Sequence, residues 1–316
     1  MKTSINYILH DRPNYAYTFI KEISKINESL KSEIIVNLLT TPTSKDWKPE
    51  VDKLRATGIK TNCFSVTSGN NYMAKIKQGV SVETEYCIKL DEDIFLPANL
   101  WEYFLTNIDI LQDDNNAFLS PLLSTGIPTV DYFSESFLTQ EEKTHLYKIY
   151  LATSIPSVWG ADYSMLCKHT INAEVWNSTE FYNTVTGLEH YYRGVHPVRF
   201  SPEAQTFINN CVIKNLDKII NEKDYKLFTD KKPYLCNSVF GIKRSTWLKI
   251  LSDDSLFKDE FEEVPLNLYI RQNNLNMVFI SKGFAVHPSY NTIGIFGVDY
   301  KQISDKFFAH EYFSER

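Results

Sequence analysis

Three carboxylates stand directly after a short apolar run of the sequence and before a second one. Asp91, Glu92 and Asp93 follow residues 86–90, Tyr-Cys-Ile-Lys-Leu, and precede Ile-Phe-Leu. Hard divalent cations such as Mg²⁺ and Mn²⁺ bind one or two protein carboxylates, with phosphate oxygens completing the coordination shell. An acidic cluster at the end of a buried strand therefore predicts a cation site rather than a solvated loop.

The segments around this cluster alternate between strand-like and helix-like patterns. The predicted strands are 4–9, 33–39, 60–66 and 86–90, with a further candidate at 117–119, and the predicted helices are 14–27, 49–57, 70–82 and 98–111. Strands separated by helices form parallel sheets covered on both faces, and such sheets bind ligands beyond the carboxyl ends of their strands. We therefore expect functional residues after Leu9, Val66 and Leu90.

This alternation stops near residue 124 and resumes near residue 233. In between, a Thr139-x-x-Glu142 capping box predicts a helix at 139–152, and Ser201-Pro202 predicts one at 202–220. The pattern indicates an inserted helical subdomain. The chain is thus expected to have three parts, at 1–123, 124–232 and 233–316, the last with strands at 234–242 and 277–286 and helices at 245–251 and 263–273.

The order of these features resembles the metal-dependent glycosyltransferases of the GT-A fold, whose D-x-D motif follows a buried strand after three βα units. Asp91-Glu92-Asp93 matches that motif. The resemblance implies an α/β, Rossmann-like, mostly parallel sheet with helices on both faces. It also implies that Asp91 contacts the donor ribose or a metal, and that Asp93 coordinates Mn²⁺ or Mg²⁺ bridging the donor diphosphate.

Two other segments agree with the resemblance on the donor side. Residues 10–13, His-Asp-Arg-Pro, open a helix after the first strand and are similar to the nucleotide-contacting loop of inverting members. The segment 70–79 looks like the family's helix before the D-x-D strand, which carries a side chain toward the donor. The alternative for its lysines is a solvated helix face. The implied donor site consists of His10, Asp11, Arg12, Asp91 and either Lys75 or Lys77.

Two features near the C-terminus complete the resemblance. Residues 261–266, followed by Arg271, are similar to the family's E-D-x-x-L…R segment, which implies that Glu263, beside Glu262, takes the proton of the acceptor hydroxyl. The alternatives are that these acids only favour a helix N-terminus, or that transfer retains configuration and needs no such base. His287 follows the last strand, where many members carry a third metal ligand, unless it is simply a packed histidine.

The resemblance covers residues 1–123 and 233–295, which become the nucleotide-sugar-binding half and the acceptor half. A basic stretch indicates a polyanionic acceptor. Residues 214–249 hold nine basic and four acidic side chains. Aromatic residues also interleave with Arg and His at 191–200, a mixture that can hold phosphates and stack bases. The alternative is an ordinary solvated face. The predicted acceptor contacts are Arg193, Arg199, Lys231, Lys232, Lys243 and Arg244.

These observations predict an inverting hexosyl- or pentosyltransferase that uses a UDP-sugar. DNA, as in phage enzymes that glycosylate modified bases, is slightly favoured as acceptor over a surface glycan or a lipid-linked saccharide. Two other functions stay open. A sugar nucleotidyltransferase is disfavoured because its Gly-rich loop is missing after the first strand, and a non-catalytic nucleotide-sugar binding module is disfavoured because Asp91, Asp93 and Glu263 are all present.

Composition excludes several other classes of protein. The 316 residues are 43% hydrophobic and 23% charged, as in folded globular chains rather than disordered ones. The net charge of −6 argues against a uniformly basic nucleic-acid binder. No apolar run approaches the roughly 18 residues of a membrane span, and the N-terminus lacks a secretion signal. Five cysteines, an odd number without C-x-x-C spacing, indicate reduced thiols, so a cytoplasmic protein is expected.

Overall fold

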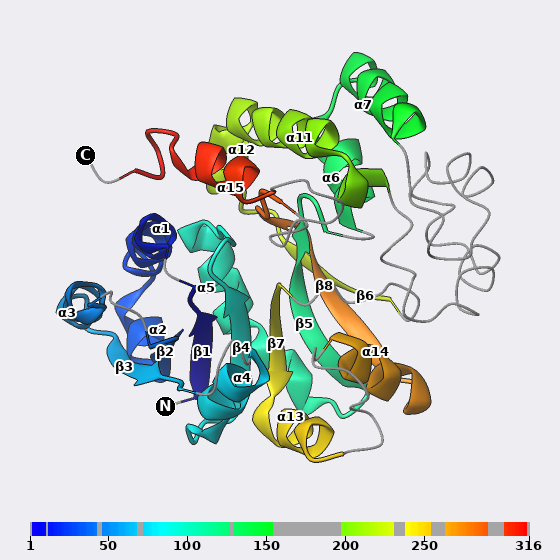
Figure 1. Ribbon diagram of the computed structural model, residues 1–316. Coiled ribbons are helices and arrows are strands. Elements are labelled where there is room, and N and C mark those ends of the chain that lie inside the picture. The colour runs from blue at the N-terminus through cyan, green and yellow to red at the C-terminus, as the bar shows by residue number, and fades with distance from the viewer. Residues whose placement is uncertain are drawn as a thin grey trace.

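An eight-stranded sheet forms the centre of the molecule (Figure 1). The computed structural model describes residues 2–10, 12–42, 46–67, 72–126, 129–153, 197–230, 238–253, 263–289 and 300–314. Within these, the strands are β1 Thr3–Ile8, β2 Ile34–Thr40, β3 Lys60–Ser65, β4 Tyr86–Asp91, β5 Asn116–Leu123, β6 Lys226–Asp230, β7 Val239–Lys243 and β8 Asn276–Ala285. Their order across the sheet is β3-β2-β1-β4-β7-β5-β8-β6.

The sheet is mixed, with parallel pairing in the majority among the described strands. Strands β3, β2, β1 and β4 are parallel neighbours, and β5 pairs in parallel with β8. Strand β7 runs antiparallel to both β4 and β5, and β6 runs antiparallel to β8. The predicted α/β class with a mostly parallel sheet is therefore confirmed.

Helices cover both faces of this sheet, because its strands bury side chains on alternate sides. One core cluster joins the sheet to α1 Pro13–Ile23, α3 Lys48–Ala56, α5 Ala98–Thr106 and the 3₁₀ helix η1 Ile108–Gln112, with α2 Glu28–Glu33 beside α5. The other cluster contains residues of α4 Tyr72–Ser81, α6 Thr129–Phe137, α7 Gln140–Ala152, η4 Pro197–Phe200, α11 Pro202–Lys214, α12 Leu216–Asn221, α13 Arg244–Leu251, α14 Glu263–Gln272 and α15 Lys301–Phe308. None of the described helices has the length and apolar character needed to cross a membrane.

Several boundaries differ from those expected. The predicted helix 14–27 ends at Ile23, and the predicted helix 202–220 is divided at Asn215 into α11 and α12. The segment predicted to be helical also contains β6, which joins the main sheet at its edge. The sequence pattern did not predict strand β6, because the strand is short and begins and ends with a charged residue. The predicted capping box of α7 is confirmed, since Thr139 and Glu142 exchange both of its hydrogen bonds.

Helix α4 lies unusually close to the sheet. A Cβ atom at Gly79 would lie 2.6 Å from Cγ of Asn6, so only glycine allows this approach. The Asn6 side chain is itself held, because its Oδ1 accepts a 2.8 Å hydrogen bond from Asn37, whose own Oδ1 accepts one from Asn62 at 3.0 Å. This contact fixes the height of α4 above β1 and β2, and with it the side chains that α4 presents at the ends of the strands.

Candidate functional site

The carboxyl ends of β1 and β4 meet at the point where the strand order reverses. The chain passes from β1 to β2 on one side, while β4 lies against β1 on the other side, with Ile8 opposite Asp91. Reversals of this kind open a crevice between the loops that leave the two strands, and α/β proteins bind ligands there. The segments after Leu9 and Leu90 are thus neighbours, as the sequence predicted.

Glu92 ties these two segments together. Its Oε2 accepts a 2.6 Å hydrogen bond from the backbone N–H of His10, and its Oε1 lies 3.3 Å from Nε of Arg12. Tyr7 donates a 3.1 Å hydrogen bond to the backbone carbonyl of Glu92. The Glu92 side chain is buried, which raises its pKa to about 7 against the opposing effects of His10 and Arg12. Glu92 therefore acts as a strut between the loops.

Asp91 is engaged through both of its carboxylate oxygens. Lys89 lies with its Nζ 2.7 Å from Oδ2, and the Tyr72 hydroxyl donates a 3.1 Å hydrogen bond to Oδ1. Lys89 is fully buried, and its ammonium lies 5.1 Å from the centre of the Tyr72 ring. Burial raises the pKa of Asp91, and the positive charge of Lys89 opposes that change. The carboxylate thus belongs to an ion pair under the site, and 24% of its side chain stays exposed.

Asp93 differs from Asp91 because one of its carboxylate oxygens has no hydrogen-bond partner among the described residues. Its side chain is buried, Oδ1 lies 3.8 Å from Nε2 of His287, and Oδ2 has no hydrogen-bond partner among the residues described. Burial raises the pKa of Asp93 to about 6 and lowers that of His287 to about 4. At 3.8 Å, the neutral His287 imidazole is too far from the Asp93 carboxylate for a hydrogen bond. A metal cation that accepts an electron pair from each group could lie between them.

His287 reaches this place through pairing between distant segments. Phe95, two residues after Asp93, exchanges backbone hydrogen bonds of 3.0 and 2.8 Å with Val286. The backbone N–H of His287 also donates a 3.0 Å hydrogen bond to Ser124 Oγ, and Thr125 donates to its carbonyl. The carboxyl end of β8 is thereby fastened to the loops after β4 and β5.

A divalent ion fits Asp93 and His287 by the chemistry of their ligands. The two would supply a buried carboxylate oxygen and an imidazole nitrogen, a set that suits Mn²⁺ and also Mg²⁺ when phosphate oxygens contribute. Across the described ranges, no three His, Cys, Asp or Glu side chains form a group that could hold a metal. In the part of the chain that the structure describes, Asp93 and His287 would thus leave coordination positions for phosphate oxygens or water.

The predicted lysines of α4 have different environments. Lys75 is buried and donates a 2.6 Å hydrogen bond to the backbone carbonyl of Leu9, so it supports the segment after β1 from below. Lys77 is exposed on the same helix. Arg12 is largely buried, and its NH1 atom has no hydrogen-bond partner in the described part of the chain. Arg12 thus offers a ligand a buried donor that no described residue uses.

The acceptor residues that can be placed lie far along the strands from this site. Lys243 stands opposite Tyr86, at the amino end of β4, and its Nζ lies 2.9 Å from Asp114. Arg244 donates a 2.8 Å hydrogen bond to the carbonyl of Val80. The structure therefore does not bring either residue together with Asp91 and Asp93.

The other predicted residues can be located only in part. Glu263 begins α14 and Arg199 belongs to η4, but the side chains of both lie outside what the structure describes. The remaining five predicted positions fall wholly outside the described residues, namely Asp11, Arg193, Lys231, Lys232 and Glu262.

Sequence reasoning missed two polar residues of the site. Lys89 could have been found, because it interrupts an apolar strand two positions before Asp91 and so shares its face of the sheet. Tyr72 carried no local signal, since its contact with Asp91 depends on how α4 crosses the strands.

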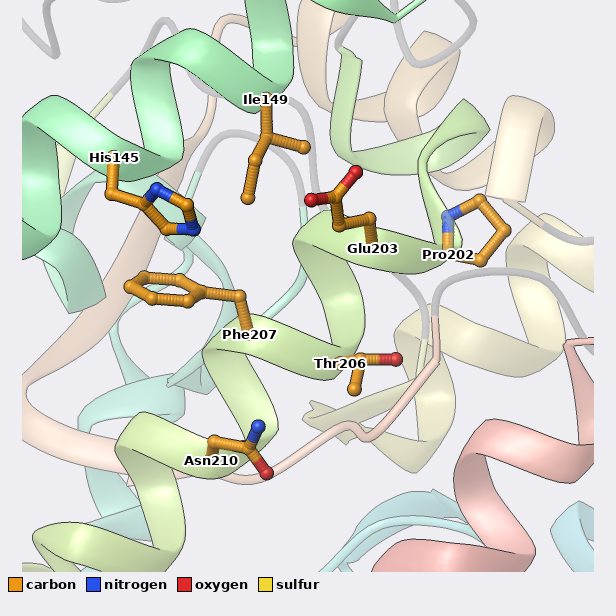
Figure 2. A pocket seen from close by; sticks show the side chains of 7 residues that line it. All are labelled: His145, Ile149, Pro202, Glu203, Thr206, Phe207 and Asn210. Atoms are coloured by element: carbon orange, nitrogen blue, oxygen red, sulfur yellow. The ribbon is translucent and has the colours of Figure 1, made fainter.

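Two hollows of the described surface lie away from this site. One, of about 360 Å³, lies between α7 and α11, where His145, Phe207 and Glu203 border it (Figure 2). Another, of about 430 Å³, lies between Lys21, Lys214 and the C-terminal Tyr312. Their charged side chains are at the surface, so the buried carboxylates and Arg12 identify the candidate site better than concavity does.

Comparisons with known proteins give the following similarities. No protein-family model matches the sequence, and no match was found among curated proteins. The crystal structure of S. aureus TarS 1-349 in complex with UDP-GlcNAc has a TM-score of 0.35 and 13% identity, over 69% of this chain and 73% of that one. The glucosyl-3-phosphoglycerate synthase of Mycobacterium tuberculosis, in complex with Mn²⁺, UDP and glucosyl-3-phosphoglycerate, has a TM-score of 0.30 and 10% identity, over 69% and 66%. TM-scores of this size do not establish a shared fold.

Proposed function

We propose that this chain is a metal-dependent glycosyltransferase that moves a sugar from a nucleotide-sugar donor to a hydroxyl group. One observation carries the proposal, namely the environment of the buried Asp93 carboxylate across the strand-order reversal from Arg12. Its Oδ1 lies 3.8 Å from Nε2 of His287, and its Oδ2 has no hydrogen-bond partner in the described residues. This arrangement suits a cation and a diphosphate in the same crevice.

In this proposal, the residues around the reversal have separate roles. Asp93 and His287 would hold a divalent ion, which when bound would neutralise negative charge on the departing diphosphate. Arg12 donates from its buried NH1 atom to the donor phosphates. Asp91 is partly exposed and fixed by Lys89, so it accepts a hydrogen bond from a donor hydroxyl. Glu92 and Lys75 hold the loop that contains His10 in place.

The acceptor hydroxyl must lose a proton as its oxygen attacks the sugar. The resemblance of residues 261–266 to the family's base segment supports Glu263 as the group that takes this proton, with inversion at the sugar carbon, and Glu262 as its neighbour. A UDP-sugar is the donor we propose. The role of Glu263 and the choice of a UDP-sugar both rest on the sequence resemblance. The side chain of Glu263 lies outside the described residues.

DNA stays the proposed acceptor, with less support than the donor site. Lys243 pairs with Asp114 and Arg244 contacts the backbone of Val80, both away from the site. Contact with DNA phosphates would therefore depend on Arg193, Arg199, Lys231 and Lys232. Reversing the charge of Lys231 and Lys232 together should weaken duplex DNA binding and reduce its salt dependence. The reason is that a complex with fewer phosphate contacts releases fewer counterions when it forms. A glycan acceptor should be unaffected.

The proposed function is tested by measuring UDP release from UDP-sugars with Mn²⁺, with and without EDTA. We expect slow donor hydrolysis that needs the metal and increases when the correct acceptor is added. Duplex DNA with hydroxymethylated bases and a saccharide mixture serve as the two acceptor arms. Pyrophosphate release from UTP and a sugar 1-phosphate would instead indicate a nucleotidyltransferase. Nucleotide binding without any turnover would indicate a non-catalytic module.

A further inference from the structure

The C-terminal segment, residues 300–314, contacts residues that lie two or three positions from Arg12, Asp93 and His287 in the sequence. Asp305 on α15 accepts a 2.6 Å hydrogen bond from the hydroxyl of Tyr15, on the helix that follows the Arg12 loop. Ser304 lies 2.8 Å from Ser289, two residues after His287. The Phe313 ring lies 5.0 Å from that of Phe95, two residues after Asp93. Figure 1 shows α15 beside α11.

Within this segment, Asp305 connects to Arg12 through a single residue. Tyr15 is 3% exposed, and its ring lies 5.1 Å from the guanidinium carbon of Arg12. The Phe308 ring, also on α15, lies 4.1 Å from the Tyr15 ring. Asp305 therefore fixes the hydroxyl of Tyr15, and Phe308 fixes its ring. The surface over which Arg12 lies is thus set by the C-terminal helix.

Arg12 is consequently held on two sides. Its Nε lies 3.3 Å from Oε1 of Glu92, and its guanidinium carbon lies 5.1 Å from the centre of the Tyr15 ring. These contacts use one nitrogen and one face, and leave the buried NH1 without a partner among the described residues. A planar guanidinium contacts a phosphate well only in a narrow range of orientations. A small rotation of the Tyr15 ring would therefore misdirect NH1.

We propose that Asp305 and Tyr15 are positioning residues that orient Arg12 for the donor diphosphate. This inference rests on the proposed function for its consequence at the donor. Its structural part, the orientation of Arg12 by the C-terminal helix, holds for the ligand-free protein as well. Burial and the nearby Asp305 both raise the pKa of Tyr15, so the phenol keeps the proton that it donates to Asp305.

The test uses Asp305→Ala, Tyr15→Phe and the double variant in the full chain. Tyr15→Phe keeps the ring under Arg12 and removes only the bond to Asp305. Thr18→Val is the matched control, because Thr18 donates a 3.3 Å hydrogen bond from α1 to the carbonyl of Phe313 in the same C-terminal segment. It changes the attachment of that segment without touching Tyr15 or Arg12.

Two measurements are made on each variant. The first is the NMR signal of the Arg12 Nε–Hε group without ligand, assigned by its loss in Arg12→Lys. The second is UDP binding with Mn²⁺, followed by KM and kcat for the donor. We expect a sharp signal in wild type and Thr18→Val, and a broadened one in both test variants. UDP affinity and donor KM should worsen about 3- to 10-fold in each, with kcat nearly unchanged.

The double variant should be no worse than either single one, because both remove the same interaction. A sharp Arg12 signal in Asp305→Ala would overturn the proposal, as would equal loss of UDP affinity in Thr18→Val. If wild type binds no nucleoside diphosphate, the proposed function fails. The Arg12 signal would still decide whether Asp305 and Tyr15 orient that side chain.

Discussion

Neutralising Asp91 should destabilise the protein much more than neutralising Asp93. Asp91 is the ion-pair partner of Lys89, which is completely buried, whereas Asp93 has an oxygen without a partner in the described structure. Asp91→Asn therefore removes the negative charge that lies 2.7 Å from a buried ammonium. Asp93→Asn removes a buried negative charge that no described cation contacts directly.

The expected magnitudes follow from these contacts. Deleting one partner of a buried ion pair costs about 3–5 kcal/mol. Asn keeps an oxygen that can accept from Lys89, and the Asp91 side chain is 24% exposed, so we expect Asp91→Asn to lower the unfolding free energy by about 2–3 kcal/mol. Asp93→Asn should change it by at most about 1 kcal/mol in metal-free protein, since it breaks no hydrogen bond of that oxygen.

Urea unfolding of the metal-free proteins at pH 7 measures this difference. The double variant Asp91→Asn/Lys89→Met is the control, because it replaces the whole ion pair with neutral groups and should recover part of the lost stability. Equal destabilisation by Asp91→Asn and Asp93→Asn would refute the reasoning. So would a double variant that is less stable than Asp91→Asn alone.

Two further predictions concern α4 and the proposed base. Gly79→Ala should destabilise the fold by about 1–3 kcal/mol in urea unfolding, because the new methyl group would meet the Asn6 side chain at 2.6 Å, and Asn6→Ala in the same chain should restore part of that loss. Glu263→Gln should lower kcat by roughly 10²–10⁴ with UDP affinity unchanged, and Glu262→Gln should be milder. A product that retains the donor's anomeric configuration would contradict the base assignment.

The order of elements could be predicted because it is determined locally. Runs such as 33–39 are apolar on both sides and short, which indicates buried parallel strands, and the acids after Leu90 mark a strand end. Parallel strands bring their carboxyl ends to one edge, so placing residue 10 near residue 91 required no further information. The register of Ile8 opposite Asp91 agrees with that reasoning.

Contacts between distant segments could not be predicted in the same way. Asp305 and Tyr15 are separated by 290 positions, and neither has a neighbour that indicates the other. Lys243 and Arg244 were predicted acceptor contacts because they belong to a basic stretch, but β7 runs antiparallel to β4 and places Lys243 opposite Tyr86, at the end of β4 away from Asp91. The apolar pattern of a strand does not encode its direction, so this location could not be predicted from the sequence.

The most direct test of the proposed donor site is calorimetric titration of UDP into the protein, with and without Mn²⁺, in wild type, Asp93→Asn and Lys249→Ala. Lys249 is exposed on α13, the helix that follows β7 at the amino end of β4, and serves as the control. We predict UDP binding that requires Mn²⁺ in wild type and in Lys249→Ala, and that is lost in Asp93→Asn while the protein stays folded. Equal UDP affinity with and without Mn²⁺, or Mn²⁺-dependent binding that survives in Asp93→Asn, would contradict the metal site at Asp93.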